Sequence, residues 1–542
     1  MEYQQRMAIG AWRSDNIAPA FSASALVSVI PNIRETLYVV AQGTRGRLGV
    51  GIKGQILLNQ QNINNSDYLL LGILPPLFPE WLGDRSFLEA HKLRFPYIAG
   101  AMFNEIASAA MVVEMAKAGM IGFFGSAGLP LEKIEQEINQ IEHTLLDPGL
   151  SWGSNLIYSP SDPCLESAIV DLYLRRGVKR VSAAAFMQLS PHIVRYAITG
   201  VHADSSGRIH RKNYVFAKVS RPETARIFME PAPTNILNHL VSKGQLTKTE
   251  ADLARGIPIA EDITVEADSG GHTDNRPLTA LLPTIISLRN EIISRHGYKN
   301  PIRIGAAGGL GNPLAISAAF ALGAAYVLTG SVNQSSVESG MSKEGKKMLA
   351  TAGVADMAMA PSADMFELGA KVQVLKRGTM FSNRASYLKD LYTNYNSLEE
   401  IPVNIKSKIE KEIFQSSLED IWSETQRFFM EKNPKEIENA HNNTKQKMAL
   451  VFRWYLGNAS RWAIEGNLKR RVDYQICCGP SMGAFNAWVK GSFLERIENR
   501  KVADIALNLL EGAAVNTRAQ QLRTYGLAVP ASSFDFRPRF LS

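Results

Sequence analysis

Eight short apolar runs alternate with helically patterned segments between residues 96 and 330, and this alternation constrains the fold more than any other feature. Runs of this length are typical of buried strands, and intervening helices imply parallel pairing through right-handed crossovers. Eight such units predict an α/β fold, a closed (β/α)₈ TIM barrel rather than an open sheet. The runs are PYIAGAMF (96–103), GMIGFFG (119–125), WGSNLIY (152–158), RVSAAAFM (180–187), NYVFAKV (213–219), DITVEAD (262–268), PIRIGAAGG (301–309) and AAYVLTG (324–330).

The rest of the chain is organised around this barrel. We expect an N-terminal subdomain over 1–90, the barrel over 91–380 and a helical, charge-rich C-terminal subdomain over 381–542. The segment 231–258 is too long for an ordinary crossover loop, so it predicts a helical insertion. Within the barrel, the apolar spacing of 104–119 predicts one of the helices.

The composition excludes several classes of protein. With 45% hydrophobic and 20% charged residues, the chain is typical of soluble globular proteins. Its three cysteines suit neither a disulfide framework nor a zinc site, which favours a reducing compartment. The start lacks the pattern of a signal peptide, and polar residues interrupt the most apolar region, 98–129. We therefore expect a cytoplasmic protein with no membrane span.

The charge pattern bears on partners and metals. A formal net charge of +8 at pH 7 raises affinity for polyanions, but no nucleic-acid-binding motif accompanies it. A solvated basic surface and an acidic protein partner both remain open. The histidines His143, His192, His202 and His210 show no metal-ligand spacing, so we predict no metal site.

The ends of the last two predicted strands are rich in small residues. Gly308 and Gly309 follow the seventh strand, and Gly330 and Ser331 follow the eighth. In a TIM barrel these loops commonly form a phosphate site from backbone N–H groups. Either pair alone could simply make a tight turn; together they favour phosphate binding. A substrate phosphate, a nucleotide and flavin mononucleotide (FMN) all fit this reading.

Two further strand ends carry titratable side chains. His272 follows Gly270 and Gly271 after the sixth strand, and Lys218 lies at the end of the fifth. An imidazole titrates near neutrality, so His272 is a candidate hydrogen-bond donor or proton source, although a loop histidine without function is the alternative. Lys218 is a second electrostatic candidate, equally consistent with a lysine extending to solvent. The methionine-rich segment 356–369 reads as a cover over the barrel mouth or an acyl-chain surface.

Several motifs carry a family resemblance. GGHTD, GSNLIY and the stretch from PIRIGAAGG to VLTGS resemble the FMN-binding barrel of nitronate monooxygenases and of flavin-dependent enoyl-carrier-protein reductases. VDLYLRRGVKRVSAAAFM (170–187), GAKVQVLKRGTMF (369–381) and CGPSMGAFNAWVKGSFLE (478–495) resemble one branch of that family. That branch is the trans-acting enoyl reductases of polyketide and polyunsaturated fatty-acid synthases, the PfaD type. The resemblance spans most of residues 90–525.

The resemblance implies a flavin site and a reaction. FMN would place its phosphate on the two glycine loops and its ring near the end of the first strand, with His272 near the reactive face. The reaction would be reduction of 2-enoyl thioesters on an acyl-carrier protein, with hydride from NADPH or NADH and with His272 as a catalytic residue. Lys218 is the second catalytic candidate, from its position at a strand end. The strand-one end, AGAMF, lacks the proline that many relatives have before the methionine. The cofactor-binding residues implied are Ala101, Met102, Asn155, Gly271, Gly308, Gly309, Gly330 and Ser331.

Alternatives stay open at this point. Nitronate oxidation by the same flavin is the main one, and a flavin-free scaffold within a synthase is another. The inosine-phosphate dehydrogenase class needs a cysteine after the phosphate strands, and 329–340 has none. The sequence does not decide between a homodimer and other oligomeric states.

Overall fold

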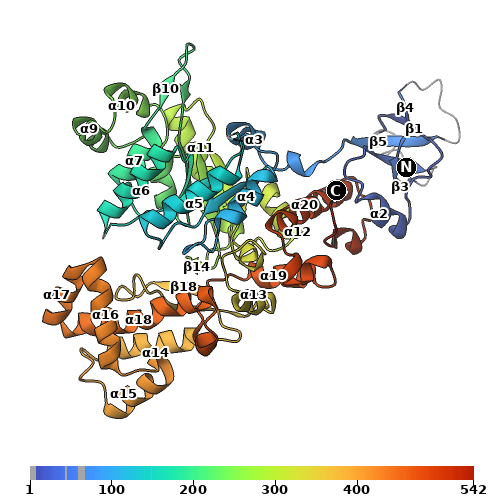
Figure 1. Ribbon diagram of the computed structural model, residues 1–542. Helices are drawn as coiled ribbons and strands as arrows, with labels where there is room; N and C mark the ends of the chain where they lie inside the picture. The colour runs from blue at the N-terminus through green and yellow to red at the C-terminus, as the bar shows by residue number, and fades with distance from the viewer. Residues whose placement is uncertain (1–7, 43–45, 59–66, 148, 161, 542) are drawn as a thin grey trace.

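In the computed structural model, which describes residues 8–42, 46–58, 67–147, 149–160 and 162–541, eight strands close into a barrel (Figure 1). Neighbouring strands pair in parallel, and the strands are almost wholly buried, as expected for a sheet covered on both faces. The predicted TIM barrel is confirmed, because each of the eight apolar runs contains one barrel strand. The strands are β6 (Tyr97–Ala99), β7 (Ile121–Phe124), β8 (Gly153–Ile157), β9 (Arg180–Ala184), β12 (Tyr214–Val219), β13 (Asp262–Glu266), β15 (Arg303–Ala307) and β16 (Val327–Thr329).

Helices surround the barrel, and local capping decides where they begin. The Asn312 side chain accepts a hydrogen bond from the Ala315 N–H at 2.9 Å, with Pro313 as the first residue of α12. The helix expected over 104–119 starts only at its sixth residue, because the two residues at its predicted start have positive φ and Ser108 caps the helix. The barrel helices are α4 (Ala109–Lys117), α5 (Leu131–Thr144), α6 (Pro163–Arg176), α7 (Pro191–Ile198), α8 (Pro222–Met229), α11 (Leu278–His296) and α12 (Pro313–Ala321).

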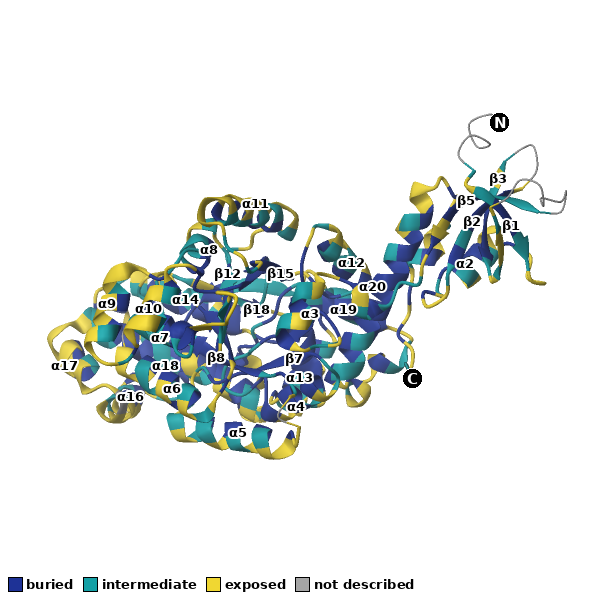
Figure 2. Cartoon of the chain, turned by 90° about the horizontal axis from the view of Figure 1, so that it is seen from above, coloured by how far each residue is buried: buried dark blue, intermediate teal, exposed yellow. Residues whose placement is uncertain are grey.

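The long C-terminal helix α20 (Val502–Thr524) belongs to the outer layer of the barrel. It packs against α12 and α4, the helices that follow the seventh and first barrel strands (Figure 1). After β16 the chain continues as the short helix η3 (Ser331–Ser335), so α20 fills the position of an eighth barrel helix. Most of its residues are buried, as the dark-blue ribbon in Figure 2 shows.

A five-stranded antiparallel sheet precedes the barrel, with strand order β3-β2-β5-β1-β4. It is tied to α20, because Arg518 donates to the carbonyls of Leu74 and Pro75 and Arg34 pairs with Glu511 at 2.7 Å. The elements up to the first barrel strand are β1 (Gly10–Ser14), α2 (Ala23–Val29), β2 (Leu37–Gln42), β3 (Arg47–Ile52), β4 (Gly54–Leu57), β5 (Tyr68–Leu74), η2 (Pro79–Trp81) and α3 (Arg85–His91).

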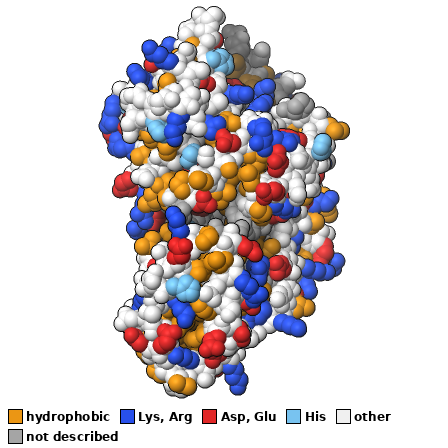
Figure 3. All heavy atoms as spheres, turned by 60° about the vertical axis from the view of Figure 1, so that its left-hand side comes forward, with side chains coloured by type: hydrophobic (Ala, Val, Ile, Leu, Met, Phe, Trp, Pro, Cys, Tyr) orange, Lys and Arg blue, Asp and Glu red, His pale blue; other side chains and the backbone are white. Residues whose placement is uncertain are grey.

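Helices α14 to α18 form a lobe beside the barrel (Figure 1), and Figure 3 shows a recess between the two with hydrophobic side chains on both sides. In the described part of the chain, no helix is long and apolar enough to cross a membrane, and no cluster of His, Cys, Asp or Glu could hold a metal ion. The lobe and the elements after it are α14 (Phe381–Asn394), α15 (Val403–Ile409), η4 (Glu410–Phe414), α16 (Leu418–Lys432), α17 (Pro434–Asn442), α18 (Thr444–Glu465), η5 (Leu468–Asp473), α19 (Ser481–Val489), η6 (Phe493–Glu495), η7 (Ile497–Asn499) and, after α20, η8 (Ala531–Phe534).

Helices also fill the long connection between β12 and β13. They are α9 (Thr234–Ser242) and α10 (Lys248–Ala254), and both fall within residues 231–258. A two-stranded ribbon of β10 (His202–Ala203) and β11 (Ile209–His210) lies near α10. Together they form an outlying layer that Figure 1 places at the edge of the barrel.

A buried ionic cluster closes the amino-terminal end of the barrel. Asp262 accepts two hydrogen bonds from Arg303 at 2.6 and 2.7 Å, and its second oxygen lies 2.9 Å from His91 Nε2. Arg180 donates to His91 Nδ1 at 3.2 Å, so the imidazole carries its proton on Nε2. Burial lowers the pKa of His91, with further lowering from the two arginines. Burial alone would raise the pKa of Asp262, but Arg303 and His91 hold it well below its usual range.

Asp262→Asn should therefore destabilise the fold by about 3–5 kcal/mol, because buried Arg303 loses the carboxylate that accepts both of its hydrogen bonds and keeps only Glu261, at 3.9 Å. Asp171→Asn removes a carboxylate that is half exposed on α6 and should change stability by less than about 1 kcal/mol. Urea unfolding of both variants measures the difference. Equal midpoints would show that the cluster contributes no net stability.

The same cluster predicts a pH dependence of stability. The unfolded chain binds protons at both groups more readily than the folded chain, since both folded pKa values are lowered. Stability should therefore fall as the pH drops below about 6.5, and again below about 3.9. Urea midpoints measured across this range check both steps, and a midpoint that does not change with pH would contradict them.

Candidate functional site

The two glycine loops lie side by side at the carboxyl ends of the neighbouring strands β15 and β16. Gly308 and Gly309 have φ values of +86° and +72°, which favour glycine. A Cβ at Gly308 would come within 2.8 Å of the backbone after β13, whereas the space beside Gly309 and Gly330 is open to 4 Å. Ser331 is 9% exposed, and its Oγ accepts a hydrogen bond from the Gly479 N–H at 3.0 Å. The loops thus leave backbone free for a small anion to approach.

Asn155 supplies a buried acceptor on β8. Its backbone carbonyl accepts hydrogen bonds from Ser126 Oγ at 2.8 Å and from the Tyr173 hydroxyl at 2.7 Å. Its side-chain Oδ1 is buried and has no hydrogen-bond partner among the described residues, which points to a donor supplied by a ligand. Ala101 and Met102, half-buried, follow β6 at the same end of the barrel.

His272 lies on a small sheet that covers this end of the barrel. Strand β14 (Gly271–His272) pairs with β18 (Lys371–Leu375), which pairs with β17 (Met357–Pro361). His272 is opposite Val372 in the register, and Gln373 donates to Asp268 Oδ1 and the Ser269 carbonyl, each at 2.7 Å. Gly270 and Gly271 give this loop conformational freedom in sequence terms. In the structure, the antiparallel pairing with β18 and the buried Gln373 hold it in one conformation.

Two side chains that sequence reasoning did not single out engage the imidazole. Ser362 Oγ lies 3.0 Å from His272 Nε2, and Asp364 Oδ1 lies 3.3 Å from the same nitrogen. Ser362 also donates to Asp364. Burial would raise the pKa of Asp364, but hydrogen bonds and the charge of His272, with Ser362, lower it to about 2. The Nε2–H therefore donates to this pair, and Nδ1 is the nitrogen that remains for a ligand.

Lys218 forms an ion pair at the carboxyl end of β12. Its Nζ lies 3.0 Å from Glu266 Oε1 on the adjacent strand β13, and both side chains are partly exposed. The structure therefore couples Lys218 to a carboxylate, whereas His272 is coupled to Ser362 and Asp364.

The segment 477–481 joins three of these loops. Gln334 donates to the Cys477 carbonyl at 2.5 Å, and a Cβ at Gly270 would come within 2.7 Å of the Cys478 backbone. A Cβ at Gly311, in the loop after β15, would likewise come within 2.1 Å of the Ser481 carbonyl oxygen. Burial raises the pKa of the Cys477 thiol to about 12, so the thiol stays protonated at neutral pH. This part of the chain positions loops and supplies no thiolate.

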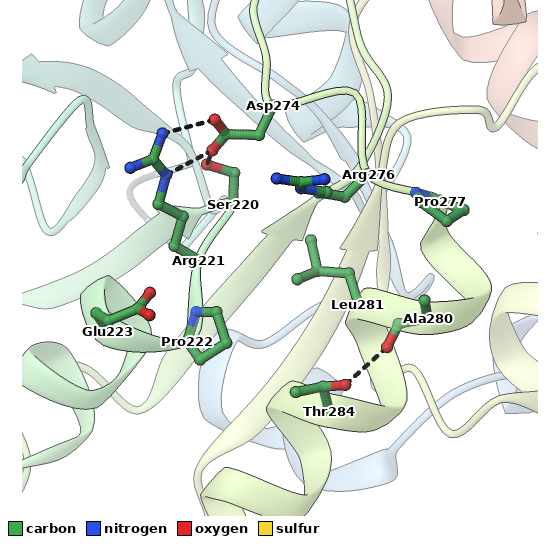
Figure 4. Close-up of a pocket in the computed structure, with 10 residues that line it drawn as sticks. All are labelled: Ser220, Arg221, Pro222, Glu223, Asp274, Arg276, Pro277, Ala280, Leu281 and Thr284. Atoms are coloured by element: carbon green, nitrogen blue, oxygen red, sulfur yellow. Dashed lines mark hydrogen bonds and ion pairs between the residues drawn. The ribbon is translucent and has the colours of Figure 1, made fainter.

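A cavity of about 500 Å³ opens beside the site, at the carboxyl end of β12 (Figure 4). None of the predicted cofactor-binding residues lines it. Its lining residues are Ser220, Arg221, Pro222, Glu223, Asp274, Arg276, Pro277, Ala280, Leu281 and Thr284.

Comparison with known proteins identifies the barrel. The model of the family described as nitronate monooxygenase matches residues 85–377, more than half of the chain. The chain belongs to the nitronate monooxygenase family. Within this nitronate monooxygenase-family protein, residues 395–474 match a second model, the inserted helical domain of [acyl-carrier-protein] S-malonyltransferase. That match covers α15 to α18 and η5, so the helical lobe is distinct from the family's barrel.

Solved and curated relatives of this family member resemble both parts. The enoyl reductase domain of MlnA, from the macrolactin biosynthesis cluster of Bacillus amyloliquefaciens, is 41% identical with a TM-score of 0.78, over 82% of this chain and 99% of that domain. A polyunsaturated fatty acid synthase component of a Thraustochytrium species is 44% identical over 82% of this chain and 30% of its own length. Polyketide biosynthesis protein PksE of Bacillus subtilis is 44% identical over 80% of this chain and 56% of its own length. The chain thus spans about a third to a half of these two curated relatives.

Proposed function

We propose that this chain reduces the 2,3 double bond of 2-enoyl thioesters during polyketide or polyunsaturated fatty-acid synthesis, with NAD(P)H as the hydride donor and FMN as cofactor. The observation that carries the proposal is the match to an enoyl reductase domain over 82% of this chain and 99% of that domain, which extends well beyond the barrel match at residues 85–377. A nitronate oxidase that resembled only the barrel would leave the lobe unexplained.

The residues at the barrel mouth fit FMN. Gly308, Gly309, Gly330 and Ser331 would hold the phosphate, because open space lies beside two of these backbones. The unpartnered Oδ1 of Asn155 would accept a hydrogen bond from the polar edge of the ring. Ala101, Met102 and Gly271 would line the ring. When bound, FMN accepts a hydride from NAD(P)H and passes it on to a substrate.

The reaction also needs a proton and a charge stabiliser. Hydride at the β-carbon generates an enolate, whose oxygen needs a hydrogen-bond donor and whose α-carbon needs a proton. His272 would supply one of the two, the hydrogen bond or the proton, from its Nδ1–H, since Nε2 is already engaged by Ser362 and Asp364. Lys218 would stabilise the developing negative charge, with Glu266 holding its ammonium group in place.

Asp364→Asn tests this arrangement. With the carboxylate gone, the imidazole loses its anchor, and kcat should fall about 10- to 100-fold while KM changes little. Asp364→Glu should restore part of the rate. Steady-state kinetics separate the two constants, and a rise in KM at unchanged kcat would assign Asp364 to substrate binding instead.

The direct test of the function compares two substrates. Purified protein is incubated with NADPH and a 2-butenoyl thioester, and the saturated thioester is measured by mass spectrometry. The proposal expects NADPH-dependent saturation and little oxygen consumption with a nitronate. Rapid nitronate oxidation without enoyl reduction would assign the chain to the alternative activity.

The partner is proposed to be an acyl-carrier protein that docks on the helical region beyond the barrel. A net charge of +8 favours an acidic partner. Carrier-bound 2-enoyl chains should therefore be reduced with a higher kcat/KM than short thioesters, and the advantage should shrink with salt, because exposed charges are screened over about 8–10 Å at physiological ionic strength. Charge reversal within 468–471 at the exposed Lys469 and Arg471, leaving the buried Arg470 in place, is the first variant. Equal, salt-independent rates for both substrates would remove the carrier from the proposal.

A further inference from the structure

The cavity at the carboxyl end of β12 is lined by an arginine, Arg276, whose side chain has no hydrogen-bond partner among the described residues. Arg276 extends from the loop before α11 into the space between Ser220 and Leu281 (Figure 4). In the described residues its guanidinium makes no hydrogen bond or ion pair, whereas the neighbouring Arg221 is held by Asp274 at 2.7 and 2.9 Å. Asp274 thus holds Arg221 by hydrogen bonds, whereas exposed Arg276 contributes only its charge at Asp274 and keeps its N–H donors for a ligand.

The backbone of Arg276 is tied to the loop that carries the candidate catalytic histidine. The backbone N–H of Asp268 donates to the Arg276 carbonyl at 3.0 Å, and the Asn275 side chain donates to Asp268 Oδ1 at 2.9 Å. The loop that carries His272 is therefore closed at its base, and Arg276 lies only four residues beyond the histidine. The cavity and His272 therefore share one loop, residues 268–276.

The lining indicates the chemistry of that group. A guanidinium recognises phosphate through paired N–H donors and keeps its charge at any working pH. The first turn of α11 has no acidic residue and no side-chain cap, so the positive end of the helix dipole is not neutralised where Pro277 and Ala280 line the cavity. Glu223 lines the cavity as well and would repel an anion beside it, so the anion is expected at the Arg276 side. Pro222, Pro277 and Leu281 provide an apolar wall.

We propose that this cavity binds a phosphate ester of a ligand that reacts at the barrel mouth. Two such ligands follow from the proposed function, on which this inference rests: the phosphopantetheine arm of the carrier and the dinucleotide hydride donor. Both present a phosphate at the end of a chain whose other end must reach the reacting centre. A volume of about 500 Å³ accommodates a group of this size.

Two matched ligand pairs test the proposal by equilibrium binding, without turnover. Isothermal titration calorimetry compares 4′-phosphopantetheine with pantetheine, and NADP⁺ with NAD⁺; each pair differs by one phosphate. We expect the wild type to bind the phosphorylated member of one pair at least about tenfold more tightly, and Arg276→Gln to remove that preference. Arg276→Lys should keep part of it. The pair that responds identifies the source of the phosphate.

A charge-matched variant completes the design. Arg255→Gln removes an exposed arginine on the insertion, at the end of α10, and should keep the preference. A wild type without preference in either pair, or a preference that survives in Arg276→Gln, would overturn the proposal. If enoyl reduction itself fails while the preference and its loss in Arg276→Gln are observed, the cavity is a phosphate site and the proposed reaction is wrong.

Discussion

His272→Ala is expected to slow enoyl reduction about 10²–10⁴-fold while the protein keeps its flavin. The variant removes the proposed proton source, the Nδ1 of His272. The other ring nitrogen, Nε2, is engaged by Ser362 and Asp364. The flavin should stay because the glycine loops and Asn155 are untouched. Stopped-flow absorbance separates the half-reaction with NADPH, which should change little, from the half-reaction with enoyl thioester.

The matched control is His239→Ala, which removes an exposed histidine on α9 and should leave both half-reactions unchanged. Equal slowing of both half-reactions by His272→Ala would mean that the histidine supports the structure or the nicotinamide. A normal rate with the thioester would eliminate it as the proton source.

Gly309→Glu is expected to abolish flavin binding, so that the protein purifies colourless. The variant side chain would enter the open space beside Gly309 and place a carboxylate where the phosphate is proposed to bind. A bulky residue at a φ of +72° is also strained, and that strain needs its own control.

Gly207→Glu provides this control. Gly207 has a φ of +75° and open space to 4 Å, but it lies in the turn between β10 and β11. This variant should be similarly strained and yet retain flavin. Flavin content is measured by denaturing release and chromatography; full retention in Gly309→Glu would place the phosphate elsewhere, and release of FAD instead of FMN would contradict the cofactor assignment.

The barrel was predictable because its strands are buried on both faces. Each therefore appears in the sequence as a short apolar run, and Asn312 with Pro313 marks a helix start by local chemistry alone. Once the strands were predicted, their carboxyl ends were known as well. Asn155, His272 and the glycine loops could therefore be proposed as site residues. Their roles remain predictions.

What the sequence did not reveal depends on contacts distant along the chain. Strand β14 has two residues, too few for a periodic signal, and its partner lies in 371–375. The segment 356–369 suggested a cover, and it contains β17 of the covering sheet; that Ser362 and Asp364 within it engage the imidazole was not foreseen. Helix α20 shows helical character locally, but its place between α12 and α4 follows only from tertiary packing.

The family resemblance is confirmed, and with it the helical addition to the barrel. The local motifs could not show that residues 477–481 bind together the loops after β13, β15 and β16, because those contacts involve backbone atoms. Backbone contacts of this kind leave little trace in residue type beyond the glycines themselves.

An anaerobic flavin measurement tests the central claim most directly. Purified protein is reduced with NADPH until the flavin absorbance disappears, and a 2-enoyl thioester is then added without oxygen. The account predicts that the absorbance returns in proportion to the thioester added and that saturated thioester forms in equal amount. An absorbance that returns only when oxygen or a nitronate is supplied, or a protein that carries no flavin, would contradict it.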